Sequence, residues 1–200
     1  MKAGTVAVIG RANAGKSTLV NVLVGEKVSI VSPKPQTTRD RILGVLTTDD
    51  YQIVFADTPG IYKAEGALNR FMQRTADGAV KEVDLILFVI DGHRGLKSED
   101  LAILKNYADK YDNLVAVMTK TDIMPEKEIP MELVKFSELG VEVIPVSARK
   151  GKNLKELLKV ILSYMPDGEK IFTEDIISDS SSRFMVGEIV REKILLKFDK

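Results

Sequence analysis

Short apolar runs alternate along this chain with longer segments whose apolar residues fall on one helical face. Runs of four to eight β-branched or aliphatic residues predict buried strands, and segments of nine or more with helical spacing predict helices. We expect strands at residues 5–9, 41–48, 51–56, 85–90, 114–118 and 141–146. We expect helices at residues 16–24, 69–80, 98–107, 131–139, 153–164 and 183–198.

The order of these elements predicts an α/β fold. Strands and helices alternate, so the sheet should be mostly parallel with helices on both faces, which makes three layers and six strands. Only Asp49 and Asp50 separate the second and third strands. A turn that short requires an antiparallel hairpin, so one strand should run against the others. Gly25 predicts a helix end, Ser98 an N-cap, and Asn153 with Glu156 a capping box.

The pattern changes after residue 166. We expect a nucleotide-binding domain over residues 1–166, a linker over 167–182 with acidic clusters and a serine run, and a separate helical segment over 183–200. The last helix has an apolar stripe that either docks on the main domain or begins a second domain cut off at Lys200. We favour the second interpretation. The stripe consists of Val186, Ile189, Val190, Ile194 and Phe198.

Composition narrows the class of protein. The chain is 44% hydrophobic and 29% charged, with a formal net charge of +0, so it can form a core but lacks the overall basic charge of a nucleic-acid binder. It has no cysteine, which excludes disulfides and cysteine chemistry. No apolar run approaches the roughly 18 residues of a membrane span, and the first strand begins at once without a signal peptide. A cytoplasmic protein fits this composition.

Residues 10–17 read Gly-Arg-Ala-Asn-Ala-Gly-Lys-Ser, which matches the phosphate-binding pattern G-x-x-x-x-G-K-[ST] between a strand and a helix. Successive backbone N–H groups and the helix N-terminus form an anion-binding concavity in such a loop. Lys16 should reach the outer phosphates, and the Ser17 hydroxyl should bind Mg²⁺. The nucleotide-contacting residues expected here are Asn13, Ala14, Gly15, Lys16, Ser17 and Thr18.

Three further polar clusters lie at strand ends or in adjacent loops, at residues 37–38, 57–60 and 119–122. Ligands of such sheets bind at the carboxyl edge, so these clusters should meet the phosphate loop. Phosphoryl transfer requires Mg²⁺ and donors on the developing charge. We expect Thr38 to be the second magnesium ligand, with Thr37 as the alternative, and Asp57 to hold the ion through water. The Gly60 N–H should face the γ-phosphate, and Lys16, Thr38, Asp57 and Gly60 form the expected catalytic set.

Asp122 indicates which base is bound. Guanine presents N1–H and an amino group side by side, and one carboxylate can accept both, whereas adenine has an acceptor at N1. Each such charge-assisted bond contributes ~1.5–3 kcal/mol. The stem of Lys120 can cover the base, with Thr119 beside it. The loop of Ser147, Ala148 and Arg149 can offer a backbone N–H to the guanine oxygen.

Together these motifs resemble the translation-factor-related GTPases, and within them the Era family. The family pattern appears in residues 10–17, in Pro35-Gln36-Thr37-Thr38-Arg39 and in residues 57–61. It continues in residues 183–184 and 188–194, and these two stretches look like the opening of Era's KH-type RNA-binding domain. The resemblance implies GTP hydrolysis to GDP, Mg²⁺, assembly of the small ribosomal subunit through its 16S rRNA, and a loose peripheral contact with the inner membrane. We expect this chain alone to bind RNA weakly, since the RNA-clamping loop is absent.

Three residues depart from related enzymes. Thr119 replaces the usual asparagine, which predicts weaker nucleotide binding with guanine preference retained. Ala12 replaces a proline, with little expected effect. Ile61 stands where Ras-like enzymes carry a water-orienting glutamine, so hydrolysis should be slow. The resemblance also implies that K⁺ near Asn13 can supply an extra positive charge.

The sequence also permits other functions. One alternative is a guanine-nucleotide-gated binding protein with negligible hydrolysis unless a partner is present, and another is an ATPase on the same fold. His93, the only histidine, lies in a loop and should be solvated. The segment from Gly92 to Gly95 should be a surface loop. Arg39 and Arg41 could contact phosphate or RNA, but we favour a solvated loop face for them.

Overall fold

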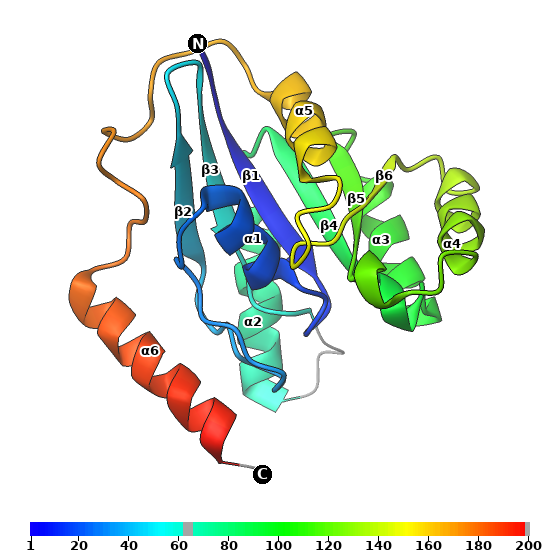
Figure 1. Cartoon of the computed structure of the whole chain (residues 1–200), viewed down its shortest axis with the longest axis horizontal. Coiled ribbons are helices and arrows are strands. Elements are labelled where there is room, and N and C mark those ends of the chain that lie inside the picture. Colours follow the sequence, from blue (N-terminus) through cyan, green and yellow to red (C-terminus); the bar gives the residue numbers. More distant parts are fainter. Residues whose placement is uncertain (62–65, 199–200) are drawn as a thin grey trace.

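The computed structural model describes residues 1–61 and 66–198, with only the backbone described at 66–69. It is an α/β protein of three layers, as the sequence predicts (Figure 1). The strands are β1 (Lys2–Gly10), β2 (Ile42–Thr47), β3 (Tyr51–Asp57), β4 (Leu85–Asp91), β5 (Leu114–Thr119) and β6 (Val143–Pro145). The helices are α1 (Lys16–Val24), α2 (Gly66–Ala79), α3 (Ser98–Ala108), α4 (Glu128–Ser137), α5 (Leu154–Tyr164) and α6 (Ser182–Lys197), with short 3₁₀ turns η1 (Gly92–Arg94) and η2 (Thr121–Ile123).

The six strands form one sheet in the order β2-β3-β1-β4-β5-β6. Only β2 runs antiparallel to its neighbour, which confirms the hairpin predicted from the two-residue turn. β1 lies at the centre and pairs in parallel with β3 and β4. The next strands in the chain, β2 and β3, lie on one side of β1, and β4 to β6 lie on the other. The connections that leave β1 and β4 therefore go to opposite sides, and their loops leave room for a ligand at the carboxyl ends of these strands.

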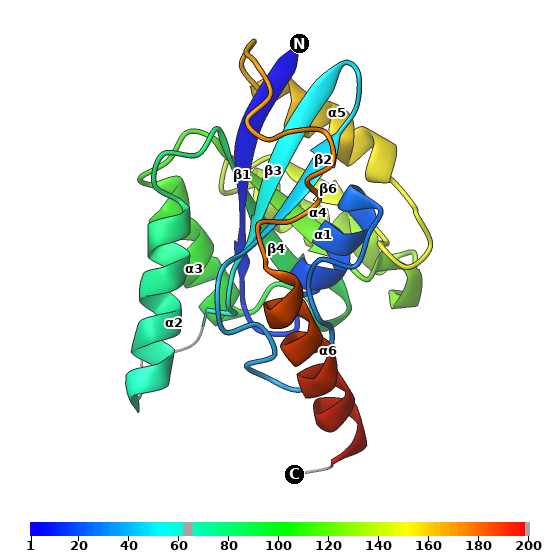
Figure 2. The same cartoon turned by 90° about the vertical axis from the view of Figure 1, so that its left-hand side faces the viewer.

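Alternation along the strands sends their side chains to two cores, one on each face of the sheet. Val6 and Val8 of β1 pack under α1 and α5, whereas Ala7 and Ile9 pack toward α2, α3 and α4. Figure 2 shows α2 and α3 on one face of the sheet and α1 and α5 on the other. Both sides of the central strands are therefore buried, as their unbroken apolar runs predict.

Several element boundaries and caps differ from the sequence prediction. Helix α3 begins at Ser98, but its N-cap is Lys97, whose backbone N–H donates to the Asp100 carboxylate at 3.2 Å. Asn153 does precede α5, yet its amide donates to the Pro145 carbonyl and caps nothing, so the predicted capping box is absent. Strand β6 is shorter than expected because only three residues pair with β5.

The segment after α5 lies against the sheet edge. The Gln52 side chain accepts hydrogen bonds from the Ile171 and Phe172 N–H groups, and the Val45 N–H donates to the Ile177 carbonyl. The Val45 bond covers part of the outer side of β2, which would otherwise expose unpaired backbone groups, and the Gln52 bonds hold the same segment against β3. Residues 167–182, predicted as a linker, are thus bound along their path.

Helix α6 packs against the rest of the protein through polar contacts, with Glu192 nearly fully buried. The Glu192 carboxylate accepts from Lys27 Nζ at 2.6 Å and from the Val31 N–H at 3.0 Å. The apolar stripe of this helix faces away from these contacts, and Val186, Val190 and Ile194 are each half exposed or more. Among the described residues, no helix combines the length and apolar character that crossing a membrane requires.

Candidate nucleotide-binding site

The loop between β1 and α1 has the backbone geometry that the glycine pattern predicts. Gly10 has φ 140°, and a Cβ there would lie 2.2 Å from the Val89 carbonyl oxygen, so no side chain fits. Gly15 has φ 99° and directly precedes α1, where unpaired N–H groups are available to an anion. These two positions explain why glycines bracket the loop.

Lys16, the first residue of α1, is buried at the base of this loop. Its ammonium donates to the carbonyls of Gly10 at 3.0 Å and Arg11 at 2.9 Å. Burial lowers the pKa of Lys16 to about 8, although the charge of Asp57 opposes the shift. The ammonium is therefore held in the loop with incomplete charge compensation, a state that a bound phosphate would relieve.

The Ser17 hydroxyl lies 3.0 Å from the hydroxyl of Thr38, which is buried although it belongs to the 32–40 loop. The neighbouring Thr37 is turned into its own loop, where its hydroxyl donates to the Lys34 carbonyl at 2.6 Å. Of the two threonines considered from sequence, Thr38 is the one that faces Ser17.

Asp57, the last residue of β3, is fully buried, and neither of its carboxylate oxygens accepts a hydrogen bond from the described residues. Burial raises the pKa of Asp57, and the nearby Ser17, Lys16 and Ser29 side chains oppose the rise. A buried carboxylate without a direct partner, beside two hydroxyls, is a donor set that suits Mg²⁺. The residues present therefore fit the expected ion.

The turn after Asp57 places Gly60 against the phosphate loop. A Cβ on Gly60 would lie 2.6 Å from Ala12 Cα, so only glycine allows this approach. The Ile61 side chain is buried in the core under α2, while its N–H donates to the Gly10 carbonyl at 3.0 Å. Ile61 thus cannot orient a water molecule, as its identity suggested. Residues 62–65, which follow Ile61 in the sequence, lie outside the described residues.

The base end of the site is formed by Asp122 and the loop after β6. The Asp122 carboxylate accepts from the buried Ser147 hydroxyl at 2.6 Å, and this bond is the main cause that lowers the pKa of Asp122. Asp122 is otherwise exposed and stands at a cavity of about 190 Å³. Ile123, Ala148 and Arg149 also line this cavity. A charged carboxylate is thus held in place at the rim of a partly apolar cavity.

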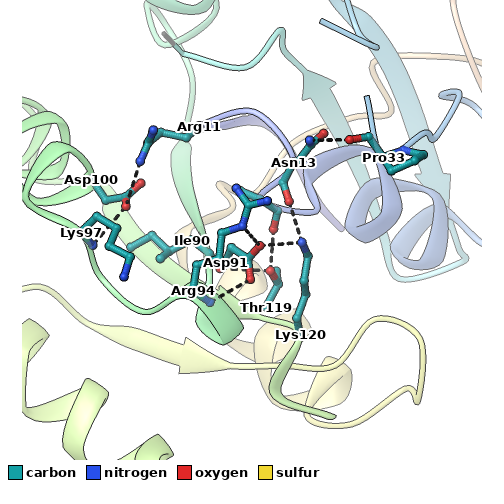
Figure 3. A network of polar contacts seen from close by, with 11 residues as sticks. Arg11, Asn13, Pro33, Ile90, Asp91, Arg94, Lys97, Asp100, Thr119 and Lys120 are labelled. Atoms are coloured by element: carbon teal, nitrogen blue, oxygen red, sulfur yellow. Dashed lines mark hydrogen bonds and ion pairs between the residues drawn. The ribbon is translucent and has the colours of Figure 1, made fainter. Parts of the chain in front are cut away.

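Thr119 and Lys120 connect the base end with the phosphate loop (Figure 3). The Thr119 hydroxyl is buried 2.5 Å from the Ala14 carbonyl and 3.0 Å from that of Ile90. Lys120 Nζ donates to the Asn13 carbonyl at 2.7 Å. On its other side, the Asn13 amide donates to the Pro33 carbonyl of the 32–40 loop at 2.7 Å.

Two cavities adjoin across these residues. The second has a volume of about 480 Å³ and is bordered by Lys16, Ser17, Thr38 and Gly60. It shares Gly15, Thr18, Lys120 and Arg149 with the cavity at Asp122. The structure therefore brings all the predicted site residues to one edge of the sheet.

Some residues at the site were not predicted from the sequence. Asp91, at the carboxyl end of β4, accepts from Lys120 Nζ at 2.6 Å, and its position at a strand end before a glycine was the available signal. Leu196 of α6 lines the larger cavity, which no sequence pattern indicates. His93, Arg39 and Arg41 are exposed, as expected.

Comparison with known proteins agrees with this geometry. Residues 5–120 match the family model described as 50S ribosome-binding GTPase. The chain is 44% identical over 202 residues to the GTPase Era of Clostridium kluyveri, covering 100% of this chain and 69% of that protein. It is 45% identical to the GTPase Era of Clostridium novyi, covering 97% of this chain and 67% of that one.

The chain belongs to the Era GTPase family. Two solved Era structures superpose on the whole chain and on 69% of their own length. One, a complex with MgGDPNP and nucleotides 1506–1542 of 16S ribosomal RNA, has a TM-score of 0.94 at 42% identity. The other, a variant of Aquifex aeolicus Era bound to GDP and AlF₄⁻, has a TM-score of 0.92 at 43% identity. The family resemblance and the fold predicted from sequence are both confirmed.

Proposed function

We propose that the chain binds guanine nucleotide across the two adjoining cavities and hydrolyses GTP slowly, as a switch protein of the Era type. The observation that carries the proposal concerns Asp122 and Lys16, which the sequence predicts to bind opposite ends of a nucleotide. They line two cavities that have four residues in common. Catalysis of phosphoryl transfer depends on positioning and charge stabilisation, and this arrangement supplies both.

Each end of the nucleotide has a defined set of partners. Asp122 accepts from the guanine N1–H and amino group, Lys120 covers the base, and the loop of Ser147, Ala148 and Arg149 offers backbone N–H groups. The N–H groups of residues 13–18 and the Lys16 ammonium bind the phosphates. Ser17 and Thr38 would hold Mg²⁺ directly and Asp57 through water. When bound, the ion neutralises charge on the outer phosphates.

Hydrolysis is slow because the side chain after Gly60 cannot reach a water molecule. Ile61 is buried, so developing charge at the γ-phosphate would be stabilised by the Gly60 N–H and the Lys16 ammonium together with the bound ion. The family resemblance supports K⁺ near Asn13 as a further positive charge. Its predicted effect is faster GTP cleavage in K⁺ than in Na⁺ at equal ionic strength. Equal rates in the two salts would contradict a K⁺ site.

Single-turnover cleavage of GTP by the purified protein tests the enzyme directly. We expect measurable conversion to GDP that Lys16→Met abolishes. No cleavage above the variant's rate would favour the alternative, a nucleotide-gated binding protein. Competition of ATP against bound GDP tests the ATPase alternative, and we expect GDP to resist displacement because adenine leaves part of Asp122 unpaired.

The role in small-subunit assembly is also a proposal. It is supported by family membership and by the half-exposed apolar stripe of α6, which would suit the opening of a KH-type domain over residues 183–200. We expect this chain to bind 16S rRNA far more weakly than the full-length Era of C. kluyveri. Equal affinities would refute the assignment. A cytoplasmic location with loose membrane contact is proposed from the family resemblance.

A further inference from the structure

A carboxylate that none of the sequence motifs contains lies at the centre of the polar network beneath the nucleotide site. Asp91 ends β4 beside Thr119 of β5, and its side chain is only 11% exposed. Its Oδ2 accepts from Lys120 Nζ at 2.6 Å, while the same ammonium donates to the Asn13 carbonyl at 2.7 Å. Figure 3 shows Lys120 directed between these two acceptors. Asp91 therefore holds the ammonium from the side opposite the phosphate loop.

Lys120 needs such support. Its backbone has φ 61°, a left-handed conformation that a lysine rarely adopts and that persists only where its surroundings hold it. Its long side chain also loses rotational freedom when the ammonium is fixed. A backbone carbonyl alone is a weak partner for a cation, whereas a carboxylate forms a charge-assisted bond. The Asp91 bond is thus the stronger of the two that fix the residue.

A second cation shares the carboxylate. The Arg94 guanidinium Nε lies 3.6 Å from Asp91 Oδ2, while the Arg94 backbone N–H donates to Oδ1 at 3.4 Å, which caps η1. The Arg94 side chain is 65% exposed and borders the larger cavity, so its hold on Asp91 is the looser one. Lys120 is the more buried partner at the shorter distance, and the effect of Asp91 should pass mainly through it.

We propose that Asp91 is a positioning residue for guanine-nucleotide binding, which acts by fixing Lys120 against the phosphate loop. This inference rests on the proposed function. Lys120 contacts the loop that both GDP and GTP would occupy, and it lies beside the base rather than with the residues assigned to the γ-phosphate. Loss of Asp91 therefore weakens GDP and GTP to the same extent and leaves the rate of bound-GTP cleavage unchanged.

A double-mutant cycle tests the inference. GDP and GTP dissociation constants and single-turnover rates are measured for wild type, Asp91→Asn, Lys120→Met and the double variant. We expect Asp91→Asn to weaken both nucleotides about tenfold, the size of one charge-assisted bond. In the Lys120→Met background the same substitution should have no further effect. Glu156→Gln, which removes a carboxylate from an exposed pair with Lys159, is the matched control and should bind like wild type.

Three results would overturn the proposal: unchanged affinity in Asp91→Asn, additive losses in the double variant, or a loss confined to GTP. Thermal midpoints identify any variant that is unfolded. Asp91→Glu keeps the charge and should recover most of the affinity, so an Asp91→Glu protein that folds but binds no better than Asp91→Asn would also refute it. If wild type itself fails to bind GDP, the proposed function fails instead, and the two failures are distinguishable.

Discussion

The phosphate end and the base end of the site are built in opposite ways. At the phosphate end, Lys16 and Asp57 are buried. Burial lowers the pKa of Lys16 and raises that of Asp57, so it favours the neutral form of each side chain. At the base end, Asp122 is exposed, and a hydrogen bond from Ser147 lowers its pKa, which favours the charged carboxylate. Burial therefore destabilises the charged side chains at the phosphate end, whereas the charge at the base end is exposed and stabilised by a hydrogen bond.

This difference indicates how each end uses a ligand. Buried charges with too few partners interact strongly with a ligand or ion of opposite charge, since solvent does not screen the interaction. The phosphate end should therefore supply most of the affinity and respond to binding with changes in protonation. The base end is already fixed in its binding geometry, so it should select the base with little change in structure.

The largest effect is expected at Lys16. Lys16→Met removes the buried ammonium and leaves Asp57 without its nearby positive charge, so GDP and GTP affinities should fall by about a hundredfold or more. Equilibrium titration with a fluorescent GDP analogue measures the loss. Lys159→Met, which removes an exposed ammonium, is the control. A loss smaller than that of the base-end substitution below would reverse the assignment of the two ends.

Asp122→Asn should change the choice of base. The amide replaces one acceptor with a donor, so GDP loses one or two charge-assisted bonds and about ten- to hundredfold in affinity. Xanthine carries a carbonyl where guanine carries the amino group, so XDP should bind the variant better than GDP does. The thermal midpoint of the nucleotide-free protein should barely move because Asp122 is exposed. Unchanged preference for GDP would show that another residue reads the base.

Proton uptake on GDP binding distinguishes the two ends of the site in the wild-type protein. Lys16 has a pKa of about 8 in the free protein, and bound phosphates should raise it. Between the two values the complex holds more protons than the free protein, so GDP affinity should fall as pH rises above about 8, at most tenfold per pH unit. Calorimetry at pH 8.5 in buffers of different ionisation enthalpy should detect uptake of up to one proton. At pH 6.5, where Lys16 is charged in both states, this uptake should disappear.

The sequence predicted much of this molecule because its signals are local. The strand before Gly10, the helix after Lys16 and the two-residue turn at Asp49 each follow from neighbouring residues. The capping box at Asn153 failed because the amide found a tertiary partner, the Pro145 carbonyl. Ser98 failed as a cap for a different, local reason, since the helix begins one residue earlier and the Asp100 carboxylate accepts from the N–H of its N-cap, Lys97.

Contacts between distant segments were out of reach. Asp91 and Lys120 are 29 positions apart, and no spacing rule relates the end of one strand to the residue after the next. The approach of Leu196 to the site depends on the path of residues 167–182 along β2, which the bonds to Gln52 and Val45 determine. A serine- and acid-rich composition indicated only a linker there.

The smallest expected effect lies between the two ends, at Thr119. Its hydroxyl bonds to the Ala14 carbonyl and thus supports the phosphate loop, but its short side chain offers nothing further to the base. Thr119→Asn should tighten GDP binding about three- to tenfold, because an amide can both donate and accept in the cavity that Thr119 lines. Thr119→Val keeps the shape without the hydroxyl and should weaken binding, since it leaves the Ala14 carbonyl without this donor. If both substitutions weaken GDP binding equally, the prediction for asparagine is wrong. Thr119 would then contribute to binding by supporting the phosphate loop and not through the base.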